Sequence, residues 1–410
     1  MSVTFYFKIP KVCLLLLLAV AHSKCEDVDE LLGVIVFYRH GDRAPLVLYQ
    51  TDPYNESTYW PMGLGQLTNL GKMQLYELGQ WLKERYGEFL SVSDSYVRST
   101  DYDRTLMSAE CCLAGLFPPD PNQTWNIQVN WQPVAIHTTS LAMDPVLAME
   151  EPCERYEALY HSLLNTKKFL HIHEENQELY DYITKNANFP VDSFQSLQLI
   201  HDTLHIEELY NLTLPDWTKH VYPDKMNEWA WFSFALATYT QQLARLKTGP
   251  LFNEIYNNIR KASQNLGPKM YMYSGHDSTI AAILDTLKIF DIHHPPYGAT
   301  ILFELRSRQN ASFVNIFYKN ATVPAKMTLN GCSFDCPLEK FYKILNEIRL
   351  DYEEWKLECS IPLRSVQSMV FNAFFGILFM IFSIFIILIM CNMRSISNYY
   401  VRIPSTKSNI

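Results

Sequence analysis

Apolar and polar positions are grouped along the chain in patterns that predict strands alternating with helices. Residues 31–38 form a fully apolar run, which is typical of a strand buried on both faces of a sheet. Leucines at spacings of three to five between residues 66 and 90 predict an amphipathic helix. Further along the chain, the same patterns predict strands at 270–274, 299–305 and 313–318 and a helix at 278–287.

The middle of the chain has a different pattern. Residues 150–245 have mostly helical periodicity, interrupted by Pro190, Pro215 and Pro223, and contain few strand signals. A helical block between two strand-and-helix regions predicts an α/β domain with an α-helical insert. We place the core at about 24–133 and 245–362 and the inserted cap at about 134–244.

The N-terminal region has the features of a secretory signal. Lys8 and Lys11 precede the apolar run 12–20, and Ala21-His22-Ser23 offers small residues for cleavage. Residues 1–23 are therefore interpreted as a cleaved signal peptide.

The C-terminal region contains an almost wholly apolar stretch from Met369 to Met390. At ~1.5 Å per residue it is long enough to cross a ~30 Å hydrocarbon core, so we predict a transmembrane helix at 366–391. The expected topology is a single-pass type I membrane protein with a lumenal or extracellular body and a cytosolic tail, 392–410. Three basic residues of the tail fit the positive-inside rule: Arg394, Arg402 and Lys407.

Sequons and cysteines agree with a secretory location. Five predicted N-glycosylation sites lie on the lumenal side: Asn55, Asn122, Asn211, Asn310 and Asn320. Seven cysteines fall on that side, where disulfides persist, and because seven is odd at least one stays free or pairs outside the chain. They are Cys25, Cys111, Cys112, Cys153, Cys332, Cys336 and Cys359.

The formal net charge of −9 argues against a general nucleic-acid binder, so an anion site needs a local concentration of arginine. Such a concentration follows the first strand, in VIVFYRHGDRAP (34–45). Arg39 and His40 are expected at the carboxyl end of the strand, where α/β sheets bind ligands; Gly41 would turn the chain sharply and Arg43 would return over the same place. Two guanidiniums suit a tetrahedral dianion, and fixed positive charge favours a neutral, nucleophilic imidazole. An isolated Arg-His-Gly would be an ordinary surface turn.

Two more strand ends carry candidate residues. His276 and Asp277 follow the strand at 270–274; the imidazole could hold a phosphate oxygen and the carboxyl could protonate a leaving alcohol. Alone, this pair also fits a helix N-cap. At the third junction, Val97 ends a short strand and Ser99-Thr-Asp is expected to cap a helix from about Asp103 to Leu116. Arg104 in its first turn opposes the helix dipole, which a bound anion would offset; a solvated or salt-bridged arginine is the alternative.

These elements together resemble the histidine acid phosphatase family of the prostatic and lysosomal type, to which insect venom acid phosphatases are also similar. The resemblance covers nearly all of residues 31–359. It rests on segments in the family's order: RHGDRAP, GLGQLTNLG, RSTDYDRTLMSA with LFPP, NLTLPDW, YSGHDST and CSFDCPLEKF. The fold it implies is a mixed central sheet with helices on both faces, like phosphoglycerate mutase, plus the inserted α-helical cap, within a lumenal domain at 24–365.

The resemblance implies a role for each candidate. His40 resembles the nucleophile that becomes phosphohistidine, and Asp277 the general acid that later helps to activate water. The implied phosphate clamp is Arg39, Arg43, Arg104 and His276, whereas Arg98 does not match a family position. Implied substrates are small phosphomonoesters, no cofactor or metal is expected, and a homodimer is typical of the family. His171-Ile-His173 and His293-His294 lack the other ligands that a metal site needs.

The resemblance also implies disulfides Cys153–Cys359 and Cys332–Cys336. Cys111 and Cys112 are then most simply buried helix cysteines, and Cys25 stays unassigned. In the tail, Tyr400 to Ile403 fits a tyrosine-based sorting signal read by cytosolic adaptors, which together with the family would place the protein in lysosomes or at the cell surface.

Two rival functions remain at this point. A phytase or inositol-polyphosphate phosphatase of the same superfamily would need extra lysines or arginines around the mouth of the site. A catalytically inactive membrane receptor or adhesion protein should have lost some of the six candidates, and all six are present: Arg39, His40, Arg43, Arg104, His276 and Asp277.

Overall fold

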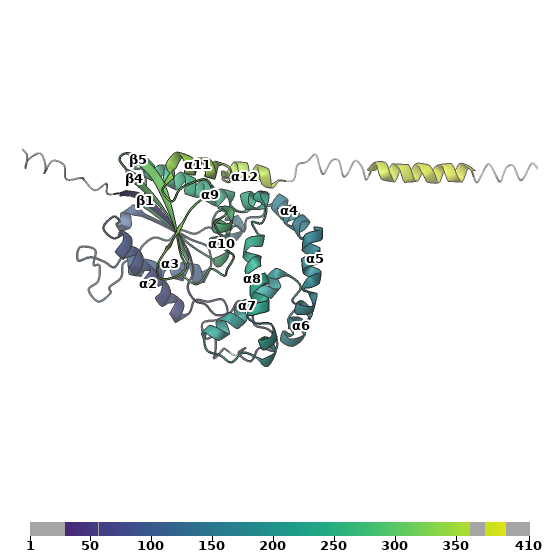
Figure 1. Cartoon of the computed structure of the whole chain (residues 1–410), viewed down its shortest axis with the longest axis horizontal. Coiled ribbons are helices and arrows are strands. Elements are labelled where there is room, and N and C mark those ends of the chain that lie inside the picture. The colour runs from purple at the N-terminus through teal and green to yellow at the C-terminus, as the bar shows by residue number, and fades with distance from the viewer. Residues whose placement is uncertain (1–28, 56, 361–373, 391–410) are drawn as a thin grey trace, which may run out of the picture. The chain divides into compact units, whose positions relative to one another are not determined.

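The computed structural model describes residues 29–55, 57–360 and 374–390, which fall into two units that divide between Lys356 and Leu357 (Figure 1). The first unit contains a sheet and the helices around it. The described strands are β1 Glu30–Arg39, β2 Ser95–Ser99, β3 Met270–Gly275, β4 Thr300–Arg308, β5 Ala311–Lys319, β6 Ala325–Met327 and β7 Cys336–Pro337. The helices outside the cap are α2 Asn69–Tyr86, α3 Asp103–Leu116, α9 Gln241–Ser263, α10 Asp277–Thr286, α11 Leu338–Asn346 and α12 Tyr352–Cys359.

The sheet is mixed, as the resemblance implied. Its order is β2-β3-β1-β4-β5-β6, with β7 also paired to β5. β1 and β2 each pair parallel to β3, whereas β4 is antiparallel to β1 and to β5. Arg39 lies opposite Gly275, and Ser99 lies opposite Ser274. The carboxyl ends of the three parallel strands therefore meet at one edge, and the three candidate motifs follow these ends.

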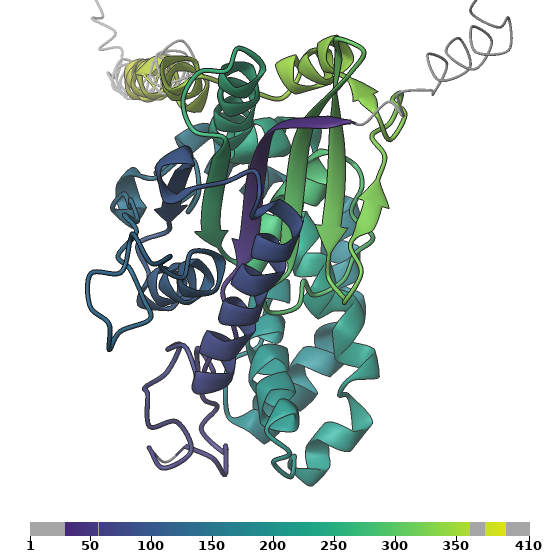
Figure 2. The ribbon, with the colours of Figure 1, turned by 90° about the vertical axis from the view of Figure 1, so that its left-hand side faces the viewer.

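Helices cover both faces of the sheet, which explains why β1 is apolar without interruption (Figure 2). Val34, Val36 and Tyr38 pack in one cluster with α2 and α3. Ile35 and Phe37 point to the opposite face and pack with α9, α10 and α11. A strand buried on both faces has no position at which a polar side chain reaches water.

The predicted helical block is confirmed between β2 and β3. Its helices are α4 Glu154–Leu164, α5 Lys167–Glu175, α6 Gln177–Ala187, α7 Phe194–Leu209 and α8 Asp224–Leu236. α7 and α8 pack against each other, and in Figure 2 β1 runs toward this group of helices. The boundaries of core and cap given above stay predictions.

One local expectation was wrong, and the role of one glycine became clearer. Ser99-Thr-Asp does not cap α3: the N-cap residue is Tyr102, whose side chain makes no capping hydrogen bond. The Ser99 hydroxyl donates instead to the Thr100 carbonyl, 2.8 Å away, because Ser99 is still part of β2. Gly41 does not have a positive φ; it is needed for close approach, since a Cβ there would lie 2.3 Å from the Gly71 carbonyl oxygen in α2.

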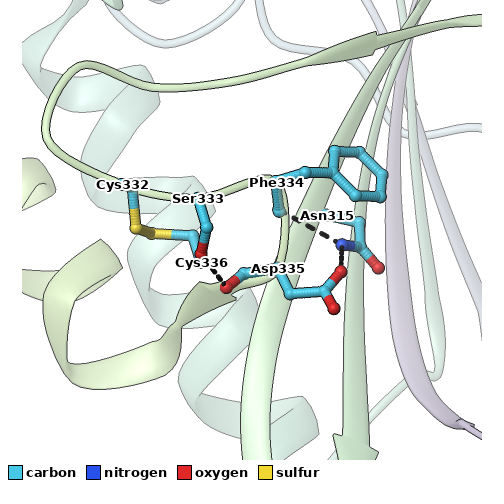
Figure 3. The surroundings of a disulfide bond; sticks show 6 residues. All are labelled: Asn315, Cys332, Ser333, Phe334, Asp335 and Cys336. Carbon is cyan, nitrogen blue, oxygen red and sulfur yellow. Dashed lines mark hydrogen bonds between the residues drawn. A yellow bond between two sulfur atoms is a disulfide. The ribbon is translucent and has the colours of Figure 1, made fainter.

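The predicted disulfide Cys332–Cys336 is present and fixes a tight loop beside β5 (Figure 3). Within the loop the Ser333 hydroxyl donates to the Asp335 carbonyl, and Asn315 of β5 donates to Phe334 and Asp335 from outside it. Cys153 and Cys359 are also disulfide-bonded. Cys112 is a buried free cysteine of α3, as expected, whereas its neighbour Cys111 is partly exposed.

The predicted targeting segments lie mostly outside the described residues. This holds for the signal peptide 1–23, for Cys25, for the tail with Tyr400, and for 366–373 and 391 of the predicted membrane span. Residues 374–390 are helical. In the described part of the chain, no helix combines the length and the apolarity that a membrane span requires. The asparagines of all five sequons are exposed.

Candidate functional site

His40 follows the last residue of β1 and is almost completely buried. Its Nδ1 lies 2.8 Å from the carbonyl oxygen of Gly41. Because a carbonyl only accepts, Nδ1 carries the proton of the neutral ring and donates it to this oxygen, which leaves the lone pair on Nε2. The ring centroid of His40 lies 5.5 Å from that of His276.

Arg39 and Asp277 form an ion pair across the ends of β1 and α10. Arg39 Nη2 lies 2.9 Å from Asp277 Oδ2. The same guanidinium donates through Nη1 to the Pro295 carbonyl, 2.5 Å away, and lies 4.1 Å from the ring centroid of Tyr297. Asp277 is the first residue of α10, so its carboxylate also lies at the positive end of the helix dipole.

Arg43 is held by the cap. Its Nη1 donates to Asp202 Oδ2 of α7 at 2.9 Å, and both side chains are buried. Burial alone would raise the pKa of Asp202, but Arg43, together with His294 and Arg39, outweighs burial and lowers it. A helix of the insert therefore fixes one candidate of the core.

His276 and Arg104 complete the group. Arg104 Nη2 donates to His276 Nδ1 at 3.4 Å, so His276 Nε2 carries the ring proton and donates to the Thr100 hydroxyl at 3.0 Å. The guanidinium of Arg104 lies 4.4 Å from the ring centroid of Tyr102. Among the described residues Arg104 has no ion-pair partner, unlike Arg39 and Arg43.

Positive charge dominates the group, because Asp277 and Asp202 pair with two of the three arginines while Arg104 keeps an unpaired charge among the described residues. Burial, and then Arg39 and Arg43, hold the pKa of His40 well below its usual range. Burial and Arg104 lower the pKa of His276 to about 3. Burial and Arg43 also lower the pKa of Arg104. Groups whose charged forms are disfavoured in this way would gain from a bound anion.

For Asp277, in contrast, the surroundings favour the charged form. Burial alone would raise the pKa of this carboxyl, but Arg39 and His294 outweigh burial and hold it well below the usual range. The site therefore contains an ionised Asp277 and a neutral His40.

A cavity of about 660 Å³ opens beside these residues. The end of β1 and the residues after it contribute Arg39 and Asp42, and helices α7 and α8 contribute further residues. The loop after α10 contributes His293, His294, Pro296 and Tyr297. Apolar and aromatic side chains, among them Leu70 and Trp231, line much of the wall. The cavity has room for a phosphate and an attached organic group.

The structure thus brings all six candidate residues to one sheet edge. Arg98 lies apart: its Nη2 pairs with Asp144 Oδ1 at 2.7 Å. His171 is exposed and pairs with Glu175. His293 Nε2 lies 2.8 Å from the Tyr318 hydroxyl.

Sequence reasoning missed the residues that hold the candidates in place, among them Asp202, Thr100, Tyr297 and His294. Asp202 belongs to α7 and His294 to a loop, and neither stands in a catalytic motif. One signal was available, since His201 and His205 are four residues apart and share a helix face. Both line the cavity.

Comparison with known proteins agrees with this geometry. A family model described as "Histidine phosphatase superfamily (branch 2)" matches residues 30–319. Prostatic acid phosphatase of Rattus norvegicus is 37% identical over 346 residues, which cover 81% of this chain and 90% of the relative. Lysosomal acid phosphatase of Homo sapiens is 35% identical over 340 residues, which cover 80% of each chain.

Solved structures with the same fold include bacterial phytases. A Klebsiella phytase aligns over 82% of this chain and 100% of its own, with a TM-score of 0.60 and 16% identity. A Hafnia alvei phytase aligns over 82% and 99%, with a TM-score of 0.58 and 18% identity. At this identity the likeness shows the fold alone.

Proposed function

The chain belongs to branch 2 of the histidine phosphatase superfamily, and we propose that it is an acid phosphatase that hydrolyses phosphate monoesters through a phosphohistidine. One observation carries the proposal: a neutral imidazole, His40, lies buried among three arginines with a carboxyl group, Asp277, at the same sheet edge. This arrangement supplies a nucleophile, an anion clamp and an acid for phosphoryl transfer.

His40 is the nucleophile. The bond from Nδ1 to Gly41 orients the ring and leaves Nε2 to attack phosphorus. The lowered pKa of His40 keeps the lone pair free at acid pH, where an ordinary histidine would be protonated. As the N–P bond forms, the bond from phosphorus to the ester oxygen breaks.

Arg39, Arg43, Arg104 and His276 bind the phosphoryl oxygens. In the described part of the chain, the Nε atoms of the three arginines are buried without a hydrogen-bond partner. Buried unpaired donors are costly, and phosphate oxygens would satisfy them with charge-assisted bonds. The same donors stabilise the charge that spreads over the oxygens in the transition state.

Asp277 protonates the leaving alcohol. Its carboxylate is ionised beside Arg39, so a proton must reach it from another group before it can act as an acid. A phosphate monoester has a second pKa of about 6 and is a protonated monoanion in acid. Once the alcohol has left, Asp277 takes a proton from the attacking water, the N–P bond breaks, and phosphate is released.

The test of this function is loss of the nucleophile. We expect His40→Ala to lower the turnover of p-nitrophenyl phosphate by more than about a thousandfold, with an unchanged thermal unfolding curve. Rapid quenching of the parent enzyme should trap phosphate on His40 in an acid-labile, alkali-stable linkage. The matched control is His171→Ala, which removes an exposed imidazole outside the site. Normal turnover by His40→Ala would refute the proposal.

The phytase alternative is less well supported by the lining of the cavity. Among the described residues that line it, Arg39 is the only lysine or arginine, and Asp42 and Glu208 add negative charge. A site for a highly phosphorylated inositol would need more cations. An inactive receptor is equally disfavoured, since all six candidates are present and close together. Rates of phosphate release from phytate and from simple monoesters distinguish a phytase from an acid phosphatase.

We further propose that the enzyme works in the secretory pathway as a type I membrane protein. The support is the apolar stretch Met369–Met390, the signal-like residues 1–23 and the exposed sequons. Lysosomal acid phosphatase among the relatives agrees with a lysosomal destination. Full-length protein should stay in the pellet after alkaline carbonate extraction and lose mass with an endoglycosidase, whereas a chain ending at residue 365 should be released.

A further inference from the structure

We propose that His294 is a positioning residue that holds Asp277 and supplies the proton that Asp277 delivers to the leaving alcohol. The inference rests on the phosphatase function proposed above. It concerns a loop residue that lies outside the candidate motifs.

The geometry places the imidazole against the carboxyl group. His294 Nε2 lies 3.4 Å from Asp277 Oδ2, the oxygen that also faces Arg39 Nη2. The distance is long for a hydrogen bond, but such contacts in empty sites often shorten when substrate binds. Both side chains are nearly buried and keep a small exposed fraction, 11% for His294 and 15% for Asp277.

The ring of His294 is fixed from its other sides. It stacks on Phe234 of α8, with centroids 5.2 Å apart and planes 17° from parallel. Its centroid lies 6.0 Å from that of His205, which in turn lies 6.3 Å from that of His201. These three imidazoles line the cavity.

The charged groups around His294 come from three elements. α10 contributes Asp277, the end of β1 contributes Arg39, and α7 contributes Asp202 together with two histidines. Those histidines, His201 and His205, have pKa values lowered first by burial, that of His201 to about 4. α8 contributes the uncharged Phe234. The ring therefore contacts the Asp277 carboxylate, whose Oδ2 it shares with Arg39, and interacts electrostatically with Asp202.

This arrangement addresses the difficulty that Asp277 is ionised beside Arg39. The imidazole of His294 can pass a proton to this carboxylate, whereas the guanidinium of Arg39, which faces the same oxygen, cannot lose one. During transfer, the proton on His294 Nε2 moves to Asp277 and from Asp277 to the ester oxygen, which leaves His294 neutral and Asp277 ionised again. During hydrolysis, water gives a proton to Asp277, which returns one to His294. No further reactant is required.

Two variants separate proton supply from packing. His294→Leu keeps an apolar side chain against Phe234, and His294→Gln keeps a hydrogen-bond donor that does not titrate. Each is assayed for kcat/KM from pH 4 to 8 on β-glycerophosphate, an alkyl ester that needs an acid, and on p-nitrophenyl phosphate, which needs it little. His171→Leu is the matched control, and thermal unfolding is measured for every variant.

We expect both variants to lose about tenfold in kcat/KM on β-glycerophosphate near pH 6.5, with the alkaline limb about one pH unit lower. The aryl ester should be nearly unaffected. Equal losses on both esters at every pH would overturn the proposal in favour of packing. Activity of the Gln variant equal to that of the parent would overturn it in favour of a simple hydrogen bond. An unchanged Leu variant would overturn it outright. A parent enzyme inactive on both esters would instead refute the phosphatase function.

Discussion

At the residue scale, the site has one group whose ionisation state opposes its proposed task. Asp277 is ionised beside Arg39 but must donate a proton. We predict that Asp277→Asn lowers kcat/KM on β-glycerophosphate by about a hundredfold or more, because an alkoxide is a poor leaving group without an acid. The loss on p-nitrophenyl phosphate should be at least tenfold smaller, since nitrophenolate leaves unaided. Both are measured at the pH optimum of the parent enzyme.

The control for this variant is Asp285→Asn, on the same helix α10 but outside the site, where the carboxylate accepts from Thr238. It should leave the ratio of the two substrates unchanged. Equal losses on both esters in Asp277→Asn would show that the carboxyl group organises the site without acting as an acid.

The sequence predicted the six candidates because each follows or opens an element with a strong periodic signal. Arg39 and His40 end an unbroken apolar run, and the rule that ligands bind beyond strand ends indicated their place. Asp202 and His294 lacked such a signal. Their contacts with Arg43 and Asp277 depend on how the cap folds over the sheet edge, which periodicity along the chain does not encode.

At the element scale, α7 is both a buried helix and a source of polar contacts with the site, and its sequence pattern does not distinguish these two roles. Ile200 to Leu204 are all buried, although three of these residues are polar. One face of the helix supplies Asp202 to the site, and near its end Glu207 contacts the loop that follows β1. A helical segment buried on all sides, such as 200–204, has no clear polar face, so its pattern identifies the helix but not its partners. The prediction of the α3 cap failed for a similar reason. The Ser99 and Thr100 hydroxyls are suited to capping a helix, but they form hydrogen bonds with the Thr100 carbonyl and with His276 instead.

Glu207 makes α7 a source of pH-dependent stability. Its carboxyl is buried beside Asp52 and the Tyr49 hydroxyl, and burial followed by Asp52 raises its pKa to about 9. The folded state thus retains a proton that the unfolded state releases above its ordinary pKa, 4.5. Stability from this group is fully present below pH 4.5 and is lost as pH rises toward 9, by up to about 1.4 kcal/mol per pH unit.

We therefore predict that Glu207→Gln flattens the decline in the free energy of unfolding between pH 5 and 8, as measured by urea denaturation. The amide keeps the shape of the side chain and does not titrate. Glu175→Gln, on the exposed surface of α5, should retain the decline of the parent. The same slope in Glu207→Gln and the parent would mean that Glu207 does not hold the proton.

At the scale of the whole molecule, the fold builds a cationic pocket inside an acidic protein. The sequence predicted the layers because β1 is apolar on both faces and α2 is apolar on one. It did not predict how closely the layers approach. Gly79 of α2 allows the backbone of α3 to pack against it, since a Cβ there would lie 2.0 Å from the Cys112 carbonyl oxygen. Isolated glycines in a helical pattern do not reveal which neighbour they admit.

The three arginines around His40 affect how activity falls toward low pH, that is, the acid limb of the pH profile of kcat/KM. Because the pKa of His40 is lowered by burial and by the arginines, we predict that kcat/KM on p-nitrophenyl phosphate falls less than about threefold between pH 6 and pH 4. An ordinary histidine, with a pKa near 6.5, would be protonated in all but roughly one part in three hundred at pH 4. An acid limb centred near pH 6.5 in the parent enzyme would contradict the prediction.

Arg104 provides the sharpest test of this effect of positive charge on His40. It has no ion-pair partner among the described residues, so its removal leaves no buried carboxylate unpaired. Removal of its charge should raise the pKa of His40 and of His276, which it also lowers. Arg104→Gln should thus move the acid limb to higher pH, whereas Arg104→Lys keeps the charge and should leave the limb in place despite weaker phosphate binding. At each pH, kcat/KM of the variant is divided by that of the parent enzyme, which cancels the effect of substrate ionisation. The same shift of the acid limb in both variants would show that donor geometry, rather than charge, determines its position.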